Sequence, residues 1–329
     1  MAKKHAILLL SLLVVFGALT GILLDRGYIV LSHPEDSAST VIMARDPALS
    51  RAMLVWENDG KICLTRLQDN AQLLVTDGRN PRWSPDGQSI VFTRGNDVWL
   101  MHRAGRKPVQ VYSGVVTEYG TGAYWTPDGK RLVMILKKNP RQVVTLSLQT
   151  GKINVIHDEG KAPFRGYELS QCAELRCNDR YLLTFTTDAG HRSMIVDLVG
   201  RQYITNRYMR EGDCGPSWSP DGRFIIMTRR VRASRKRPLY ITFFDAAQGT
   251  LSDSEFFIGG GWCHSASISN DSRYVVYVSG GNILLCPVEA VQNGVRQAFR
   301  LTATGRGDGP ALFIFPDTAS MWQILDVDG

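Results

Sequence analysis

Residues that could carry acid–base chemistry recur in short, glycine-containing segments of the chain. The clearest are Glu118, Glu211, Asp213 and His264. Paired carboxylates, or a carboxylate beside an imidazole, could support general acid–base catalysis if folding brought them together. No pair of these carboxylates has a spacing that argues for such work. The sequence therefore favours binding over catalysis, and we assign no catalytic residue.

The same segments also contain aromatic and arginine residues, and together they form a predicted ligand- or partner-binding site. Glycine allows the backbone to approach closely, while tyrosine, tryptophan, arginine and acidic side chains can line a pocket. The simpler interpretation is that these residues are polar only because the opening of a channel faces water. We call this set the predicted mouth; it comprises Glu118, Tyr119, Arg165, Tyr167, Glu211, Asp213, Trp262, His264, Arg306 and Asp308.

A second candidate surface is basic, and we call it the basic rim. Its interpretations are solvated hairpin tips, or contact with an acidic protein surface, an anionic polymer or lipid headgroups. Nucleic acid is the least expected partner, because no aromatic residues interleave the charges. The basic rim comprises Lys137, Lys138, Arg141, Arg229, Arg230, Arg232, Arg235, Lys236 and Arg237.

A repeated turn motif must position these candidates. Proline presets φ, aspartate can hydrogen-bond its own backbone, and glycine accepts the positive φ that closes a hairpin. Apolar runs follow, as in residues 90–92 and 224–227, so each copy predicts a strand–turn–strand hairpin. We call the copies anchors; the clear ones are Trp83–Gly87, Trp125–Gly129 and Trp218–Gly222, and the weaker ones are Cys177–Arg180, Ser269–Ser272 and Phe315–Thr318.

The anchor aspartates are separated by 42, 51, 42, 50 and 46 residues. A period in the forties with four short strands per unit is typical of a propeller blade. We therefore predict an all-β fold: a six-bladed β-propeller of four-stranded antiparallel blades, one blade per anchor. Strand-like runs at 53–56, 62–64 and 73–75 lack an anchor, so we expect residues 310–315 from the other chain end to close the ring.

The anchors resemble those of the TolB-like six-bladed propellers, whose blades carry a Pro-x-Trp-Ser-Pro-Asp-Gly pattern. Residues 80–87 (Asn-Pro-Arg-Trp-Ser-Pro-Asp-Gly) and 215–222 (Gly-Pro-Ser-Trp-Ser-Pro-Asp-Gly) match it closely, and the resemblance extends over about residues 50–329. It implies a role in envelope complexes. The family's namesake has an additional N-terminal α/β domain, which is not expected here, so its particular complex is not carried over.

An apolar run at residues 6–24 follows two lysines and predicts an uncleaved transmembrane helix, since nineteen residues at about 1.5 Å each cross a bilayer core. The alternative is a removed signal segment. The expected organisation is a membrane segment at 1–25, a stalk at 26–50 and the propeller at 51–329. The lysines favour the cytoplasm, which places the propeller on the periplasmic or extracytoplasmic side of a bacterial inner membrane.

Six cysteines in an exported chain invite pairing. Cys214 and Cys263 each begin the first strand of adjacent predicted blades and form the possible disulfide that we favour. Cys172 and Cys177 could pair only if the strand between them is broken or bulged, and Cys63 and Cys286 are expected to be buried, unpaired residues. No Cys-x-x-Cys spacing occurs, and of six histidines only His264 lies at the predicted mouth, so we expect neither a metal nor a cofactor.

Together these features predict a non-catalytic protein-interaction module of the cell envelope, tethered to the membrane and engaging an envelope protein. Its net charge of +7 permits an acidic partner without requiring one. The alternative is a carbohydrate-active enzyme, or another small-ligand enzyme or binder, that uses the predicted mouth. A binder of anionic surfaces through the basic rim is a third possibility.

Overall fold

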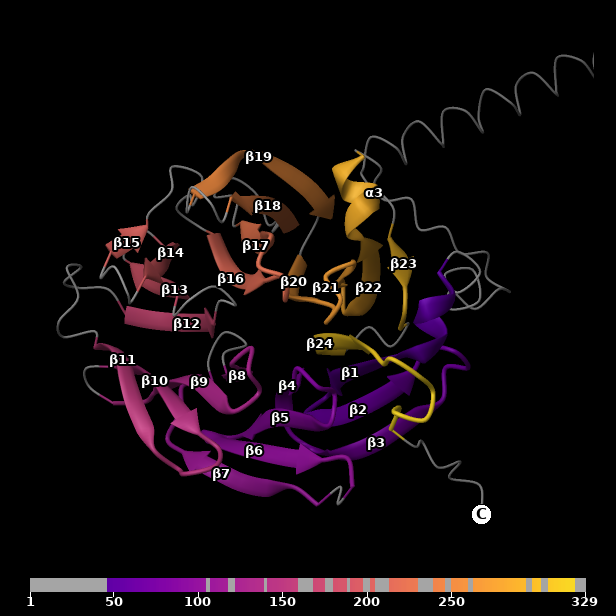
Figure 1. The fold of residues 1–329 in the computed structure, drawn as a ribbon, viewed down its shortest axis with the longest axis horizontal. Coiled ribbons are helices and arrows are strands. Elements are labelled where there is room, and N and C mark those ends of the chain that lie inside the picture. The colour runs from indigo at the N-terminus through magenta and orange to yellow at the C-terminus, as the bar shows by residue number, and fades with distance from the viewer. Residues whose placement is uncertain are drawn as a thin grey trace, which may run out of the picture.

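The computed structural model describes residues 46–104, 107–117, 122–138, 141–158, 168–174, 180–187, 190–197, 202–204, 213–229, 239–245, 250–259, 263–293, 298–302 and 307–322. Within these ranges the chain folds into four-stranded antiparallel sheets arranged around a common axis (Figure 1). Strand prediction succeeded where short apolar runs occur, because runs 53–56, 62–64, 73–75, 90–92 and 224–227 all lie in strands.

Five sheets each consist of four consecutive strands. They are β4 (Arg79–Trp83), β5 (Ser89–Arg94), β6 (Asp97–His102) and β7 (Val109–Ser113); β8 (Ala123–Trp125), β9 (Arg131–Leu136), β10 (Gln142–Ser147) and β11 (Ile153–Asp158); β12 (Glu168–Glu174), β13 (Arg180–Thr187), β14 (Gly190–Asp197) and β15 (Gln202–Ile204); β16 (Asp213–Trp218), β17 (Phe224–Arg229), β18 (Leu239–Asp245) and β19 (Thr250–Gly259); and β20 (Cys263–Ile268), β21 (Tyr274–Ser279), β22 (Asn282–Pro287) and β23 (Phe299–Arg300).

The remaining sheet joins the two ends of the chain in the order β24-β1-β2-β3. Its strands are β1 (Ala52–Asn58), β2 (Lys61–Arg66), β3 (Gln72–Asp77) and β24 (Gly307–Ile314). Two short helices flank the strands: a 3₁₀ helix, η1 (Pro47–Arg51), and α3 (Val288–Gln292). We call this sheet the closing sheet.

The prediction that every anchor forms a hairpin of its own blade is wrong for the last anchor. Five blades, not six, are built from consecutive strands whose first two pair as a hairpin. In the closing sheet β24 pairs with β1, from Ala52 opposite Ile314 to Asn58 opposite Gly307. Because these strands come from opposite chain ends, no turn can join them. The last anchor instead leads into residues 318–322, which form no strand.

The predicted membrane-spanning helix stays a prediction. Among the residues that the structure describes, no helix is long and apolar enough to cross a membrane. Residues 6–24, on which the prediction rested, lie outside the described residues.

The first strand of each consecutive blade, together with β24, forms an inner ring. Around it β24 contacts β4, β4 contacts β8, β8 contacts β12, β12 contacts β16, β16 contacts β20, and β20 contacts β24 (Figure 1). Each consecutive blade reaches its anchor only after its inner strand ends. The anchor ends of the inner strands therefore lie at one end of the ring, which we call the anchor end. The inner strands begin at the other end, which we call the connection end.

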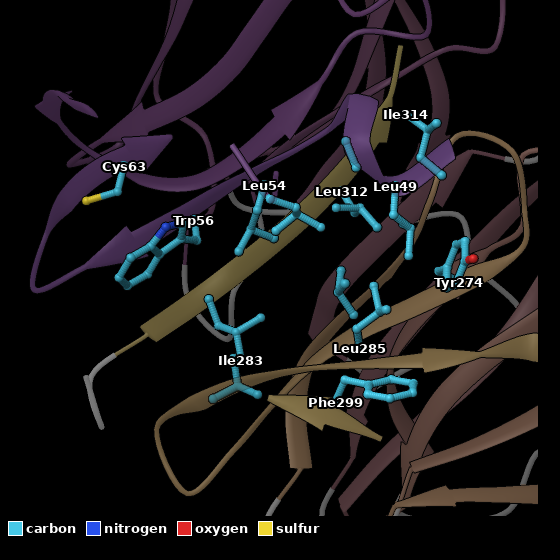
Figure 2. Close-up of a cluster of buried hydrophobic side chains, with 14 residues drawn as sticks. Leu49, Leu54, Trp56, Cys63, Tyr274, Ile283, Leu285, Phe299, Leu312 and Ile314 are labelled. Carbon is cyan, nitrogen blue, oxygen red and sulfur yellow. The ribbon is translucent and has the colours of Figure 1, made fainter. Parts of the chain in front are cut away.

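Apolar side chains fill the spaces between neighbouring sheets. Between the closing sheet and the β20–β23 sheet, Leu54, Trp56, Ile283 and Leu285 are fully buried, and Leu312 of β24 packs among them (Figure 2). Strands contribute to two such layers because successive side chains point to opposite faces. Burial of both faces accounts for the continuous apolar runs of β1 and β24.

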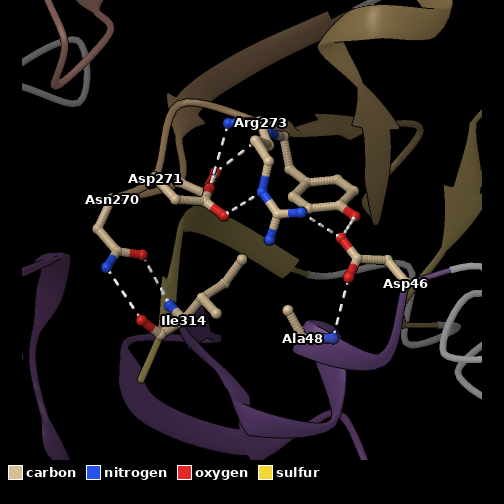
Figure 3. A network of polar contacts seen from close by, with 8 residues as sticks. Asp46, Ala48, Asn270, Asp271, Arg273 and Ile314 are labelled. Carbon is tan, nitrogen blue, oxygen red and sulfur yellow. Dashed lines mark hydrogen bonds and ion pairs between the residues drawn. The ribbon is translucent and has the colours of Figure 1, made fainter. Parts of the chain in front are cut away.

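A polar network holds η1 against the neighbouring blade (Figure 3). The Asp46 carboxylate caps the helix by accepting from the Ala48 backbone N–H at 2.9 Å, and it pairs with the Arg273 guanidinium at 2.7 Å. The Tyr274 hydroxyl donates to the same carboxylate. Asn270 binds the backbone of Ile314 through both amide atoms, at 3.0 and 2.7 Å. The first and last described segments are thus attached to one hairpin.

Candidate functional site

The anchor turns are held by the same hydrogen bonds in successive blades. In the first, the Ser84 hydroxyl donates to the Asp86 carboxylate at 2.6 Å, and the Ser89 backbone N–H donates back to Ser84 Oγ at 2.8 Å. Asp86 also accepts from the Gln88 backbone N–H at 2.9 Å. The pattern recurs at Thr126 and Asp128, Ser219 and Asp221, and Ser269 and Asp271. Serine and aspartate therefore hold these turns in one conformation.

Tryptophans before the anchors tie adjacent inner strands together. The Trp83 indole Nε1 donates to the Ala311 carbonyl of β24 at 3.0 Å. Trp125 Nε1 donates to the Arg82 carbonyl of β4 at 3.3 Å. Each indole thereby reaches back to the inner strand of the preceding sheet. These two hydrogen bonds fix the indole rings of Trp83 and Trp125 at the anchor end.

These strand ends line a cavity of about 220 Å³ that is partly open to solvent. We call it the anchor-end cavity, and five inner strands contribute to it. Its described lining comprises Arg82, Trp83, Ser84, Pro85, Tyr124, Trp125, Pro127, Ser217, Trp218, Ser219, Pro220, Ser267, Ile268, Asn270, Ala311, Leu312 and Phe313.

Most polar groups of this lining are already engaged within the protein. The hydroxyls of Ser84 and Ser219 hold anchor turns, and the Ser267 hydroxyl donates to the Pro310 carbonyl at 2.6 Å. Arg82 is the single charged residue in the described lining. Its guanidinium carbon lies 5.4 Å from the centre of the Tyr124 ring, and its Nη1 donates to the Pro81 carbonyl at 2.8 Å.

The predicted mouth falls almost entirely outside the described side chains. Of the ten, Asp308 is the one whose side chain the structure describes, and it does not line the anchor-end cavity. The predictions for Glu118, Tyr119, Arg165, Tyr167, Glu211, Asp213, Trp262, His264 and Arg306 fall outside the described side chains.

Asp308 instead forms part of an acidic pair. In the β1–β24 register it lies opposite Glu57, a buried residue. Burial first, and then the negative charge of Asp308, raises the pKa of Glu57 above its ordinary value. Arg79, whose Nε lies 3.5 Å from Glu57 Oε1, partly opposes that rise. This pair lies on the connection end of the ring.

The basic rim is described only in part. Lys137 and Lys138 follow β9, where Lys138 is exposed, and Arg141 precedes β10. The side chains of Arg229, Arg230, Arg232, Arg235, Lys236 and Arg237 fall outside the description. Whether the rim forms one surface stays a prediction.

The predicted disulfide also stays a prediction. Cys263 is fully buried, and burial raises the pKa of its thiol to about 11. Cys214 begins β16, but its side chain falls outside the description.

The anchor-end cavity was not among the predicted sites. Its sequence signal is the residue pair that ends an inner strand, Arg82-Trp83 in one blade and Tyr124-Trp125 in the next. We interpreted the tryptophans as parts of the turn motif, whereas they also form the wall of a cavity. Aligning the blades on their anchor aspartates would have placed both pairs at the same level of the ring.

Comparisons with known proteins bear on the fold. No family model and no curated protein matches the sequence. Similar solved structures include TolB from Acinetobacter baumannii, with a TM-score of 0.61 and 13% identity over 83% of this chain and 70% of that chain. A chain of a nidogen/laminin complex has a TM-score of 0.58 and 9% identity, over 79% of this chain and 98% of that chain. An oligogalacturonate lyase in complex with manganese has a TM-score of 0.52 and 16% identity, over 79% of this chain and 78% of that chain. At such low identity these likenesses concern the fold alone, and with the sheets described above they show that the chain is a β-propeller.

Proposed function

We propose that this protein is a non-catalytic, TolB-like interaction propeller of the cell envelope, and that a protein partner contacts the anchor end of its inner ring. The observation that carries the proposal is the composition of the anchor-end cavity. Tyr124, Trp125 and Arg82 are partly exposed there, above the buried Trp83 and Trp218. Tryptophan, tyrosine and arginine dominate the energetic centres of protein interfaces.

The scaffold around the cavity supports this role. Binding energy is gained most readily when the contact residues are already ordered before the partner arrives. The anchor hydrogen bonds of Ser84 and Asp86, and the indole bonds of Trp83 and Trp125, hold the cavity wall in one arrangement. One similar structure belongs to a nidogen/laminin complex, so a chain of this fold takes part in a protein assembly there.

Site-specific photo-cross-linking in cells tests the proposal. A photoreactive amino acid replaces Lys130, which is exposed beside an anchor turn, or Lys138, which is exposed in the β9–β10 turn of the basic rim. Val109 on the outer strand β7 is 60% exposed and provides the control position. We expect one discrete protein adduct from position 130 and none from position 109.

The three positions separate the alternatives. An adduct from position 138 alone would overturn the assignment to the anchor end and favour the basic rim. Equal adducts from all three positions, or none from any, would contradict a specific protein partner. Trp125→Ala serves as a second variant, because it removes one cavity wall and should abolish the adduct from position 130 while the thermal unfolding temperature shows whether the fold persists.

A further inference from the structure

We infer that the anchor-end cavity is a carboxylate-binding site in which Arg82 holds the carboxylate and the surrounding rings hold a planar or apolar body attached to it. This inference names the chemistry that the cavity recognises and rests on the proposed function only for the case in which a partner carries the carboxylate. The cavity lies at the anchor end of the ring, and Asp308, the one predicted-mouth residue with a described side chain, is not part of its lining.

The expected negative charge of the ligand follows from the polar groups of the lining that the protein does not engage itself. Ser84, Ser219 and Ser267 donate their hydroxyl protons within the protein, and Trp83 and Trp125 donate their indole protons to backbone carbonyls. Among the residues that the structure describes, Arg82 forms no ion pair and has no acidic neighbour in the cavity lining. Within the described lining, a ligand therefore meets one positive charge that no acidic side chain offsets.

The geometry of the guanidinium favours a carboxylate. Nη1 of Arg82 donates to the Pro81 carbonyl at 2.8 Å. In the described part of the chain, no hydrogen bond engages Nε and Nη2, which form the adjoining edge of the planar group. Two parallel N–H donors on one edge match the two oxygens of a carboxylate, an arrangement that a lysine cannot provide.

The size and walls of the cavity define the rest of the ligand. A cavity of roughly 150 Å³ lined by apolar residues admits benzene, so about 220 Å³ admits a substituted ring. Tyr124, Trp125 and Phe313 present ring surfaces, and Ile268 and Leu312 add aliphatic ones. Small-molecule sites typically combine such apolar walls with one or a few orienting polar groups.

Calorimetric or ligand-detected NMR titration of the whole chain tests the inference, with benzoate as the probe. Benzamide keeps the ring and shape but lacks the charge, and acetate keeps the charge but lacks the ring. We expect benzoate to bind saturably and both analogues to bind more weakly. Arg82→Gln should weaken benzoate binding by about tenfold or more, as expected for loss of a charge-assisted hydrogen bond, and Arg82→Lys should recover only part of it.

Arg300→Gln, on the exposed outer strand β23, is the matched control and should bind benzoate as the wild type does. No saturable benzoate binding, equal binding of benzamide, or an unchanged affinity in Arg82→Gln would each overturn the inference. The probe comparison uses the wild type, so the inference stays testable if Arg82→Gln does not fold.

Adding benzoate to the cross-linking experiment distinguishes the two sources of a carboxylate. Loss of the adduct from position 130 would mean that the partner itself inserts a carboxylate. Benzoate binding without loss of the adduct would mean that the cavity takes a free organic acid. If no partner is found at all, the protein-interaction proposal fails while the titration still decides the carboxylate site.

Discussion

The indole Nε1 of Trp322 donates a hydrogen bond to the backbone carbonyl of Gly87 at 2.9 Å, joining positions 235 residues apart. Trp322 is 1% exposed, and its ring meets that of Trp83 edge-on with centroids 5.3 Å apart. Gly87 belongs to the first anchor turn, so the end of the described chain is attached directly to the hairpin beside the closing sheet. The ring is closed by this contact as well as by β24.

Truncation of Trp322 should therefore destabilise the whole propeller. We expect Trp322→Ala to lower the free energy of unfolding by about 3–5 kcal/mol, the usual cost of deleting a buried aromatic side chain. Trp322→Phe keeps a ring but leaves the Gly87 carbonyl without its donor, and should cost about 1–3 kcal/mol. Denaturant titration measures both values.

The control for this comparison is Val109→Ala, because Val109 is 60% exposed. It should change the free energy of unfolding by no more than about 0.5 kcal/mol. A Trp322→Ala variant as stable as this control would show that the terminal segment does not contribute to ring closure.

Two anchor glycines provide a matched pair that separates backbone strain from packing. Gly87 has φ +70° and Gly129 has φ +67°. Alanine in that left-handed conformation costs about 1–2 kcal/mol at either position. A Cβ at Gly87 would lie 2.6 Å from the Phe313 ring, whereas a Cβ at Gly129 would lie 3.7 Å from Pro85, an ordinary contact.

Gly87→Ala should therefore be more destabilising than Gly129→Ala by about 1–3 kcal/mol, the typical cost of overpacking a core. Thermal unfolding of both variants measures the difference. Equal losses would mean that the Phe313 ring moves aside at no cost and that β24 is held more loosely than its packing indicates.

These residues also show what the sequence could predict. Local chemistry defines the anchor hairpins: Ser84, Asp86 and Gly87 lie within four positions and bind one another, so the motif indicates the turn without knowledge of the fold. Short continuous apolar runs likewise indicate the strands. The period of the anchors then suggests a propeller, because a repeat in the forties with four short strands per unit is typical of a propeller blade.

The cavity could not be predicted in the same way. Arg82, Tyr124 and Ser217 come from three blades, and their proximity depends on how closely the inner strands approach the axis. The sequence pattern shows that they end inner strands but does not show which end of the ring leaves space. Glycine and polarity in the connections directed attention to the connection end, where the buried Glu57 and the half-buried Asp308 form an acidic pair that the pattern also did not reveal.

The network around Asp46 predicts a defined pH dependence. Burial alone would raise the pKa of Asp46, but hydrogen bonds from Tyr274 and Ala48 and the charge of Arg273 outweigh it and lower that pKa. A lowered pKa in the folded state means that the ionised carboxylate stabilises the fold above the unfolded pKa of about 4, and that this contribution is lost as the pH falls through the folded value.

Asp46→Asn should accordingly lower the free energy of unfolding at pH 7 by about 1 kcal/mol, since the network is partly exposed. The difference between wild type and variant should shrink as the pH falls below about 4. Denaturant titrations at several pH values measure it. A difference that does not change with pH would mean that the loss comes from altered hydrogen bonding of the side chain and not from its charge.

The pair of Glu57 and Asp308 predicts the opposite dependence. Burial and the Asp308 charge raise the pKa of Glu57, while Arg79 and backbone N–H groups of Asn80 and Gly60 oppose the rise. The folded state therefore binds the Glu57 proton more tightly than the unfolded state, whose pKa is about 4. This contribution to stability is complete below about pH 4 and is lost as the pH rises through the folded pKa.

Asp308→Asn should lower the pKa of Glu57, and Arg79→Gln should raise it further. Carboxyl-carbon NMR titration measures both shifts, with Glu57→Gln identifying the resonance. If Asp308→Asn left the pKa of Glu57 unchanged, the rise would be due to burial alone, and the two carboxylates would not act as a coupled pair at the connection end of the ring.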